Sequence, residues 1–119
     1  MKPSSLFQLG HYSLAWVRDF YDQAGVWWGP DPQAAGVHQA RVATIARLCG
    51  AGPKRILELG AGPGATAAAL ADAGHAVVAV EFSPSRAQFA RELAQLPHKG
   101  RLTVVEADFY TVALDQRFD

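Results

Sequence analysis

The feature that most constrains this chain is a run of glycines that directly follows a short apolar segment. The apolar segment is residues 55–59 (RILEL), and Gly60, Gly62 and Gly64 come next, before an alanine-rich stretch that begins at Ala65. Apolar residues without helical spacing predict a buried strand, whereas the alanines predict a helix. Glycine lets the backbone between them turn sharply and approach a ligand closely. The stretch therefore predicts a strand, a turn and a helix N-terminus, the usual small-molecule site of an open α/β sheet.

Two further strands follow, each reached through a helix. The β-branched segments 75–81 and 102–106 predict these strands. Ser83 and Pro84 predict the N-cap and first position of the helix between them, and Pro97 predicts its end. Right-handed crossovers would arrange the three strands as a parallel half-sheet in the order 3-2-1. We therefore predict an α/β fold, a Rossmann-like parallel sheet with helices on both faces that is truncated after its third strand.

The N-terminal residues predict helices ahead of the sheet. We expect one helix over residues 5–24, with Ser13 capping a break within it. We expect a second helix that is firm over residues 37–49 and is interrupted by Gly36. These helices precede every predicted strand, so they do not form part of the alternating pattern.

Two adjacent tryptophans, Trp27 and Trp28, lie in a Gly/Pro-rich loop between the two expected helices. They either pack as a hydrophobic contact between the first helix and the rest of the protein or form a lid over a ligand. We divide the chain accordingly into an N-terminal helical lid segment, residues 1–50, and a partial α/β domain, residues 51–119.

Composition limits the classes of protein that this chain can represent. Lys and Arg together number 11, as do Asp and Glu, so the balance gives no sign of binding to nucleic acid or an anionic membrane. Half of the residues are apolar, which predicts a globular protein. The single cysteine, Cys49, allows neither an internal disulfide nor a multi-cysteine metal site, and the histidines have no metal-ligand spacing. With no apolar segment long enough for a signal peptide or a membrane span, we expect a cytoplasmic protein.

Three acidic residues fall at or near the carboxyl ends of the predicted strands, and parallel strands bring those ends to one edge. Glu81 can accept two hydrogen bonds from a ribose diol. Asp108 can accept a hydrogen bond from an adenine amino group, with Phe82 or Phe109 against the ring. Glu58 lies inside an apolar strand, where a carboxylate without a partner is costly, so a positively charged ligand group would suit it. The plain alternatives are a solvated strand-end acid for Glu81 and an ordinary turn residue for Asp108.

The glycines by themselves also fit a dinucleotide-binding fingerprint, because Gly60, Gly62 and Ala65 have its spacing and Glu81 stands where an acid would bind the ribose of NAD. Two features weigh against NAD. The carboxylate of Glu58 would face a pyrophosphate, and Pro63 lacks an N–H group that a phosphate would use. An NAD-binding oxidoreductase fragment is the first alternative, and a non-enzymatic Rossmann-like interaction module is the second.

Three motifs in sequence order resemble those of class I S-adenosylmethionine-dependent methyltransferases, over residues 55–110. Residues 56–64 (ILELGAGPG) resemble the family's E/D-x-G-x-G-x-G motif. Residues 80–83 (VEFS) are similar to the ribose-binding step after its second strand, and residues 106–109 (EADF) are similar to the adenine-binding step after its third. The resemblance implies an enzyme that uses S-adenosyl-L-methionine as its methyl donor.

The resemblance also implies which positions hold the donor. The glycine loop, residues 60–64, would lie against the methionine portion and the ribose. Glu58 would bind the amino group, and Glu81 would bind the ribose hydroxyls. Phe82 would border the adenine, and Asp108 with the N–H of Phe109 would bind the adenine edge. These positions are Glu58, Gly60, Ala61, Gly62, Gly64, Glu81, Phe82, Asp108 and Phe109.

The N-terminal segment resembles, more weakly, the helical lid of some small bacterial members, and there Tyr21 or Trp28 would face the sulfonium cation. No catalytic residue is implied. The charge balance favours a small-molecule or protein methyl acceptor over nucleic acid.

The chain departs from the family in its number of strands. The family's sheet has seven strands in the order 3-2-1-4-5-7-6, whereas residues 118–119 here would only begin a fourth. We therefore expect this chain to supply the donor-binding half of such an enzyme. Its first strand would be an exposed edge, which predicts a homodimer or a swapped sheet.

Overall fold

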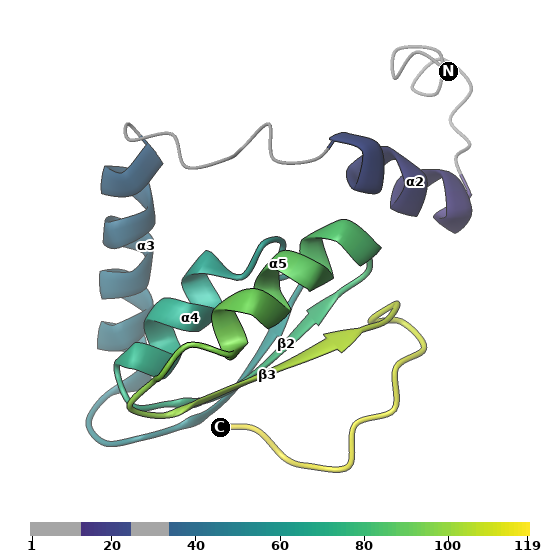
Figure 1. The fold of residues 1–119 in the computed structure, drawn as a ribbon. Coiled ribbons are helices and arrows are strands. Elements are labelled where there is room, and N and C mark those ends of the chain that lie inside the picture. Colours follow the sequence, from purple (N-terminus) through teal and green to yellow (C-terminus); the bar gives the residue numbers. More distant parts are fainter. Residues whose placement is uncertain (1–12, 25–33) are drawn as a thin grey trace.

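The computed structural model describes residues 13–24 and 34–119, which form a three-stranded parallel sheet and four helices (Figure 1). In chain order the elements are α2 (Leu14–Ala24), α3 (Ala34–Cys49), β1 (Arg55–Leu59), α4 (Ala65–Asp72), β2 (Ala76–Glu81), α5 (Pro84–Ala94) and β3 (Arg101–Glu106). Each predicted strand is present. The alternation of strands and helices from β1 onward confirms the predicted α/β fold.

The sheet has the order β1-β2-β3, and all of its strands are parallel, which confirms the predicted order. Ile56 of β1 pairs with Val77 of β2, which pairs with Leu102 of β3. With this register the three strands end close together. The residues that follow β1, β2 and β3 therefore lie along one edge, as the sequence predicts.

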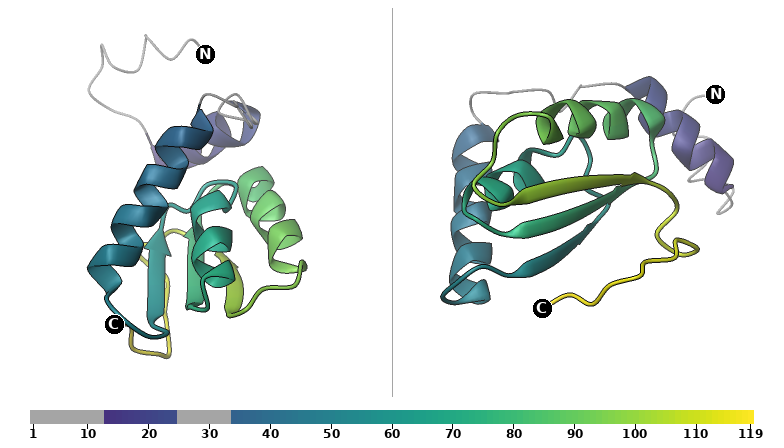
Figure 2. Two further views of the ribbon diagram at one scale, coloured as in Figure 1. Left: turned by 90° about the vertical axis from the view of Figure 1, so that its left-hand side faces the viewer. Right: turned by 60° about the horizontal axis from the view of Figure 1, so that its bottom comes forward.

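Helices α4 and α5 lie side by side on one face of the sheet (Figure 1, Figure 2), which differs from our expectation of helices on both faces. Two right-handed crossovers that step across a sheet in the same direction place their helices on the same face. In the described residues the other face carries the C-terminal segment, residues 107–119, which runs back toward β1 (Figure 2). Val78 and Val80 of β2 point to that face and are 8% and 0% exposed, so the central strand is buried on both sides.

The hydrophobic core between α4 and the sheet is made largely of alanine. Ala67, Ala71 and Ala79 are fully buried, and Leu70 is 2% exposed. Side chains this small let α4 pack close to β2, while burial of Leu70 contributes about 2 kcal/mol. The core thus holds β1, α4 and β2 together as one strand-turn-helix-strand unit, which fixes the position of the glycine loop.

The helix ends show which capping predictions hold. Ser83 accepts a hydrogen bond from the N–H of Arg86 at 3.5 Å, and Pro84 occupies the first turn of α5, as predicted. The Oγ of Ser13 accepts the N–H of Trp16 at 3.1 Å, which confirms the cap at the start of α2. Residues 1–12, where we expect the beginning of the first helix, lie outside the described residues.

Helix α3 runs without a break from Ala34 to Cys49, so our prediction that Gly36 interrupts it was wrong. A glycine within a helix costs only about 1 kcal/mol relative to alanine. It still donates and accepts the helical hydrogen bonds. The sequence signal at Gly36 was therefore too weak to end the helix.

An imidazole bridges α4 to the turn after α5. The Nδ1 of His98 lies 2.6 Å from Oδ1 of Asp72, and its Nε2 lies 2.8 Å from the carbonyl oxygen of Leu93. Both ring nitrogens face acceptors, so the doubly protonated ring satisfies both contacts. The hydrogen bonds to Asp72 and Leu93 raise the pKa of His98 above its ordinary value. His98 therefore has a structural role, because it joins α4 to the end of α5 and the turn that follows.

Replacing Asp72 by Asn is expected to flatten the dependence of stability on pH near neutrality. Because the pKa of His98 is raised in the folded chain, its protonation stabilises the fold fully below about pH 6.5, and this contribution is lost as pH rises through the folded pKa. Urea unfolding of the unchanged chain and of Asp72→Asn at several pH values from 5.5 to about 8.5 checks this. Asp19→Asn, which removes an exposed acid on α2, is the control. A pH dependence identical in Asp72→Asn and the unchanged chain would contradict the prediction.

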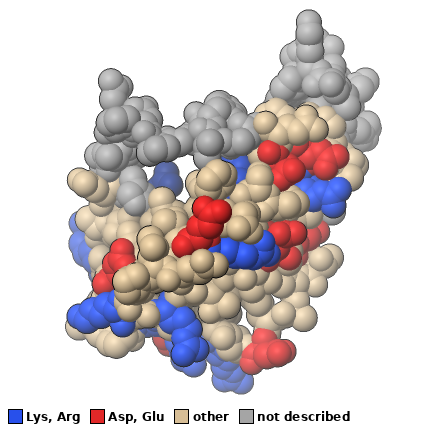
Figure 3. Space-filling view, viewed as in Figure 1, with Lys and Arg blue, Asp and Glu red and all other residues tan. Residues whose placement is uncertain are grey.

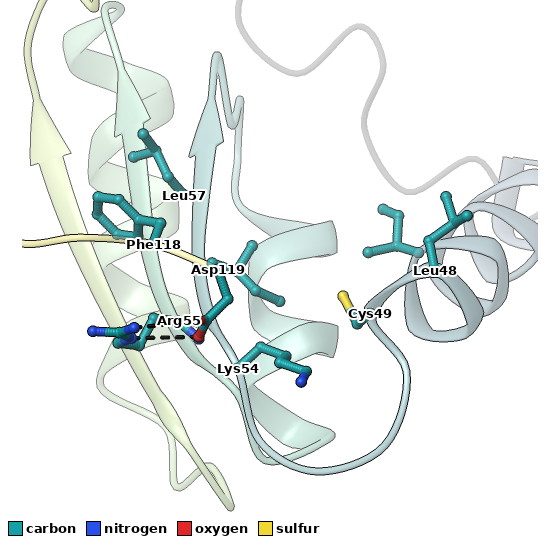
Figure 4. A pocket seen from close by; sticks show the side chains of 9 residues that line it. Leu48, Cys49, Lys54, Arg55, Leu57, Phe118 and Asp119 are labelled. Carbon is teal, nitrogen blue, oxygen red and sulfur yellow. Dashed lines mark hydrogen bonds and ion pairs between the residues drawn. The ribbon is translucent and has the colours of Figure 1, made fainter.

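The C-terminus closes on the outer edge of β1 (Figure 4). The N–H of Asp119 donates to the carbonyl oxygen of Arg55 at 2.8 Å, and the Asp119 carboxylate accepts the Arg55 N–H at 2.9 Å. The guanidinium of Arg55 also bonds this carboxylate and lowers the pKa of Asp119 to about 2. Asp119 therefore lies beside β1, where we expected a fourth strand to begin.

Candidate functional site

The glycine loop is fastened to the carboxyl end of β2 by its own backbone. The N–H groups of Gly60 and Ala61 both donate to the carbonyl oxygen of Val80, at 2.9 and 3.1 Å. The N–H of Gly64 donates to the carbonyl oxygen of Ala61 at 3.2 Å. The loop is therefore held in one shape before any ligand binds.

The three glycines of the loop have different roles. All have positive φ values, +70° for Gly60, +59° for Gly62 and +91° for Gly64, which residues with a side chain rarely adopt. A Cβ on Gly60 would meet no atom within 4 Å, whereas a Cβ on Gly64 would lie 2.9 Å from the Cβ of Ala90. Gly60 thus borders open space, while Gly64 lets α5 pack against the start of α4.

Glu81 connects the end of β2 to the loop. It is 8% exposed, and its Oε1 accepts the N–H of Gly62 at 3.2 Å while its Oε2 accepts the N–H of Phe82 at 2.8 Å. A carboxylate has about four lone-pair positions, so each oxygen keeps one for a further donor. Glu81 is therefore fixed in place and can still bind a pair of hydroxyl groups.

Glu58 carries a buried carboxylate oxygen that has no partner among the described residues, its Oε2. Burial raises the pKa of Glu58 to about 7, the nearby Arg41 lowers it, and the negative charge of Glu81 raises it further. A buried acceptor without a donor is costly. Among the described residues Oε2 of Glu58 therefore lacks a donor. That a positively charged ligand group supplies this donor stays a prediction.

The residues after β3 form a turn at the same edge. The Oδ1 of Asp108 accepts the N–H of Tyr110 at 3.0 Å, and its carbonyl oxygen accepts those of Thr111 and Val112. Phe109 is 43% exposed. Asp108 therefore has the turn-forming role that we kept as its alternative. It also lies beside the end of β2, because the N–H of the preceding Ala107 donates to the carbonyl oxygen of Glu81 at 3.0 Å.

Helix α2 reaches the site through contacts that the sequence analysis missed. The carboxylate of Asp22 accepts the N–H of Ser85 at 2.7 Å and the hydroxyl of Ser83 at 3.3 Å. These hydrogen bonds lower the pKa of Asp22. The two serines at the start of α5 were a possible signal, because exposed N–H and O–H groups at a helix N-terminus attract a carboxylate.

Tyr21 lies near the site but has a partner of its own. Its ring is 39% exposed, and the guanidinium of Arg86 lies 5.0 Å from the ring centroid. A cation of the chain itself thus contacts the ring that we expected to face a ligand cation. Trp28 lies outside the described residues, so the structure leaves its predicted role as it was.

Other kinds of site find little support in the described part of the chain. No group of three or more His, Cys, Asp or Glu residues there could hold a metal ion. His75 has a structural partner, because its Nδ1 accepts the N–H of Lys54 at 3.0 Å. None of the helices in residues 13–24 and 34–119 is both long and apolar enough to cross a membrane.

A cavity of about 440 Å³ lies away from the glycine loop, between α3 and the first half of β1 (Figure 4). Its walls are mainly apolar and include Ile45, Leu48, Ile56, Leu57 and Phe118. Its charged groups are Lys54 and the Arg55–Asp119 pair, and none of the three acids that we expect to bind a ligand, Glu58, Glu81 and Asp108, lines it. We therefore place the candidate site at the glycine loop.

Charge distinguishes the two ends of the sheet. Basic residues gather along the lower edge of the face in Figure 3, where the strands begin, and Lys54, Arg55, Lys99 and Arg101 line a shallow hollow there. The opposite edge, where the strands end, carries Glu58, Glu81, Glu106 and Asp108. The candidate site thus lies at the acidic edge, which favours a ligand with positive charge.

Comparison with known proteins identifies a family that this chain matches. The family described as "Methyltransferase domain" matches residues 56–119, more than half of the chain. Solved structures that are similar to this chain include two of one enzyme. One is the glycopeptide N-methyltransferase MtfA, with 34% identity, a TM-score of 0.58, and coverage of 68% of this chain and 36% of that one. The other is MtfA complexed with sinefungin, with 36% identity, a TM-score of 0.55, and coverage of 66% and 32%.

No curated protein matches the chain. The chain spans about a third of the length of the MtfA chains that it matches.

Proposed function

This chain belongs to the methyltransferase-domain family, and from that membership we propose that residues 51–119 form the donor-binding part of an S-adenosylmethionine-dependent methyltransferase. The observation that supports this best is a carboxylate oxygen of Glu58 beside the glycine loop, which is buried and has no hydrogen-bond partner in residues 13–24 and 34–119. An ammonium group is the donor that such an oxygen requires. The complex of MtfA with sinefungin, an analogue of S-adenosylmethionine, supports the same assignment.

We assign the methionine portion of the donor to the side of the loop that Gly60 leaves open. A ligand there can lie directly on the backbone. Glycine has no Cβ, and no atom of the described residues lies within 4 Å of the position that a Cβ on Gly60 would occupy. Glu58 would receive the ammonium group, directly or through water. The raised pKa of Glu58, to about 7, would fall when the cation binds, because an opposite charge favours the ionised carboxyl.

We assign the nucleoside to the ends of β2 and β3. Glu81 would accept the two ribose hydroxyls, because its carboxylate is already oriented by the N–H groups of Gly62 and Phe82. Phe82 would border the adenine, and Asp108 with the N–H of Phe109 would read its edge. When bound, S-adenosylmethionine supplies a methyl group on a sulfonium, and the residues named here hold and orient that donor, which is how positioning contributes to rate.

An NAD-binding function fits the loop less well. A pyrophosphate is bound by free backbone N–H groups, but those of Gly60, Ala61, Gly62 and Gly64 all donate within the chain. Pro63 has no N–H group. Glu58 and Glu81 would repel a pyrophosphate and the guanidinium of Arg86 near Gly62 would attract it, so the occupied N–H groups of the loop decide the comparison. They favour a cationic donor over a dinucleotide.

The acceptor is proposed from the relatives and from charge. MtfA is a glycopeptide N-methyltransferase, and its likeness covers 68% of this chain. The equal numbers of acidic and basic residues favour a small-molecule or protein acceptor over nucleic acid. We place the enzyme in the cytoplasm, and we propose residues 1–50 as the lid segment.

Replacing Glu81 by Gln is expected to weaken the binding of S-adenosylhomocysteine, the donor without its methyl group, about tenfold. Glutamine keeps one acceptor oxygen but loses the second and its charge, which costs about 1.5 kcal/mol. Isothermal titration calorimetry of the folded variant measures the change. Glu106→Gln is the matched control, because Glu106 pairs with Glu81 in the sheet register yet bonds Arg91 at the surface. Equal losses of affinity in both variants would contradict a specific role for Glu81.

A further inference from the structure

The side chain of Arg86 is buried where a positive charge is least expected. It is 6% exposed and lies in the first turn of α5. The N-terminus of a helix carries a partial positive charge, which disfavours a cation, and burial of a cation adds a desolvation cost. A hydrophobic residue would fill the position at lower cost, so the guanidinium requires a reason in its contacts.

Those contacts join two segments that are far apart in the sequence. The Nε of Arg86 donates to the carbonyl oxygen of Tyr21 at 3.3 Å, and the guanidinium lies 5.0 Å from the centroid of the Tyr21 ring. On its other side, Nη1 is 3.9 Å from the position that a Cβ on Gly62 would occupy. Arg86 therefore lies between α2 and the glycine loop. It contacts the backbone and ring of Tyr21 on one side and lies close to Gly62 on the other.

Gly62 is also tied to Glu81, whose Oε1 accepts its N–H at 3.2 Å. A displacement of Gly62 thus changes the contact with Arg86 on one side and the orientation of Glu81 on the other. Asp22 holds the neighbouring turn of α2 to Ser83 and Ser85 at the start of α5. The end of α2, the first turn of α5 and the glycine loop consequently form one connected unit.

We propose that Arg86 is a positioning residue that couples the docking of α2 to occupancy of the glycine loop. Ligand on the loop fixes Gly62 and with it the guanidinium, which then holds Tyr21 and closes α2 over the site. By linkage, docked α2 tightens the binding of the ligand by the same factor. This inference rests on the proposed function, because it takes the ligand to be an S-adenosyl compound.

Hydrogen exchange of the whole chain, with and without S-adenosylhomocysteine, tests the coupling. In the unchanged chain, the ligand is expected to slow exchange both in residues 60–64 and in α2. In Arg86→Met, exchange in residues 60–64 still slows, but α2 no longer responds, and affinity falls about five- to tenfold, within the usual range of coupling between sites. Arg86→Lys keeps the charge without the planar stacking group and is expected to restore only part of the response. Arg91→Met, on the exposed side of α5, is the matched control and behaves as the unchanged chain.

A second variant covers the case in which Arg86→Met does not fold. Tyr21→Ala removes the ring but keeps the carbonyl oxygen that Nε of Arg86 bonds. It is expected to reduce the response of α2 while residues 60–64 remain protected. Protection of α2 by the ligand in either folded variant, equal to that in the unchanged chain, would overturn the coupling. Absence of protection at residues 60–64 in the unchanged chain would instead overturn the donor-binding function on which the coupling rests.

Discussion

Replacing Gly64 by Ala is expected to lower the free energy of unfolding by about 2–5 kcal/mol. The positive φ of +91° at this position costs a residue with a Cβ about 1–2 kcal/mol. The added Cβ would also lie 2.9 Å from the Cβ and 3.0 Å from the Cα of Ala90. Because Ala90 is fully buried in α5, the overlap forces α4 and α5 apart, at about 1–3 kcal/mol. Urea denaturation followed by circular dichroism measures the change.

Gly52→Ala separates the two contributions in the same experiment. Gly52 has a similar φ of +81°, but a Cβ there would meet no atom within 4 Å. The Gly52→Ala variant should lose only the free energy that the positive φ costs a residue with a Cβ, about 1–2 kcal/mol. If Gly64→Ala destabilises the chain no more than Gly52→Ala, then Gly64 serves only the turn, and the close contact between the helices has no energetic weight.

Replacing Glu58 by Gln is expected to stabilise the chain without ligand and to impair binding. Burial raises the pKa of Glu58 from 4.5 to about 7. Between these values the folded chain binds more protons than the unfolded chain, so stability falls as pH rises, and the loss is complete above pH 7. After allowance for solvent screening, the shift corresponds to about 2 kcal/mol. Glu58→Gln should therefore be more stable than the unchanged chain by about 2 kcal/mol at pH 8 and equal to it near pH 4.

Glu58→Gln should also lower the affinity for S-adenosylhomocysteine about ten- to a hundredfold at pH 8, because a hydrogen bond to a charged group contributes about 1.5–3 kcal/mol. 5′-Methylthioadenosine, which has the same nucleoside but no amino-acid portion, is the control ligand and should bind both chains alike. Equal affinity of the two chains for S-adenosylhomocysteine would contradict the assignment of Glu58 to the ammonium group. A loss for both ligands would point to a general distortion of the loop.

Local patterns in the sequence were sufficient to predict the elements that form the site. The apolar segments locate β1, β2 and β3, and the spaced glycines locate the turn, because strand burial and positive φ each require particular residue types. The Glu58 oxygen that lacks a partner among the described residues could also be predicted, since an acid within an apolar strand has no neighbour in sequence to neutralise it.

Contacts between distant segments could not be predicted in this way. Asp22 meets Ser83 and Ser85, and Arg86 meets Tyr21, across more than sixty residues. No periodicity in either helix encodes such a pairing. The shared face of α4 and α5 was missed for a different reason, because our expectation followed complete sheets, in which strand order reverses and helices occupy both faces. In a half-sheet whose strands follow one another in a single direction, the crossover helices lie on only one face.

Calorimetric titration of the unchanged chain with S-adenosylhomocysteine, and of a fresh sample with NAD, tests the donor-binding assignment most directly. We predict a single site with micromolar affinity for S-adenosylhomocysteine and no detectable heat with NAD. Glu58 beside the loop offers an ammonium group an oxygen that has no partner in the described part of the chain, whereas the N–H groups of Gly60, Ala61, Gly62 and Gly64 already donate within the chain. Binding of NAD, or binding of neither compound by a chain whose circular dichroism shows that it is folded, would contradict the assignment.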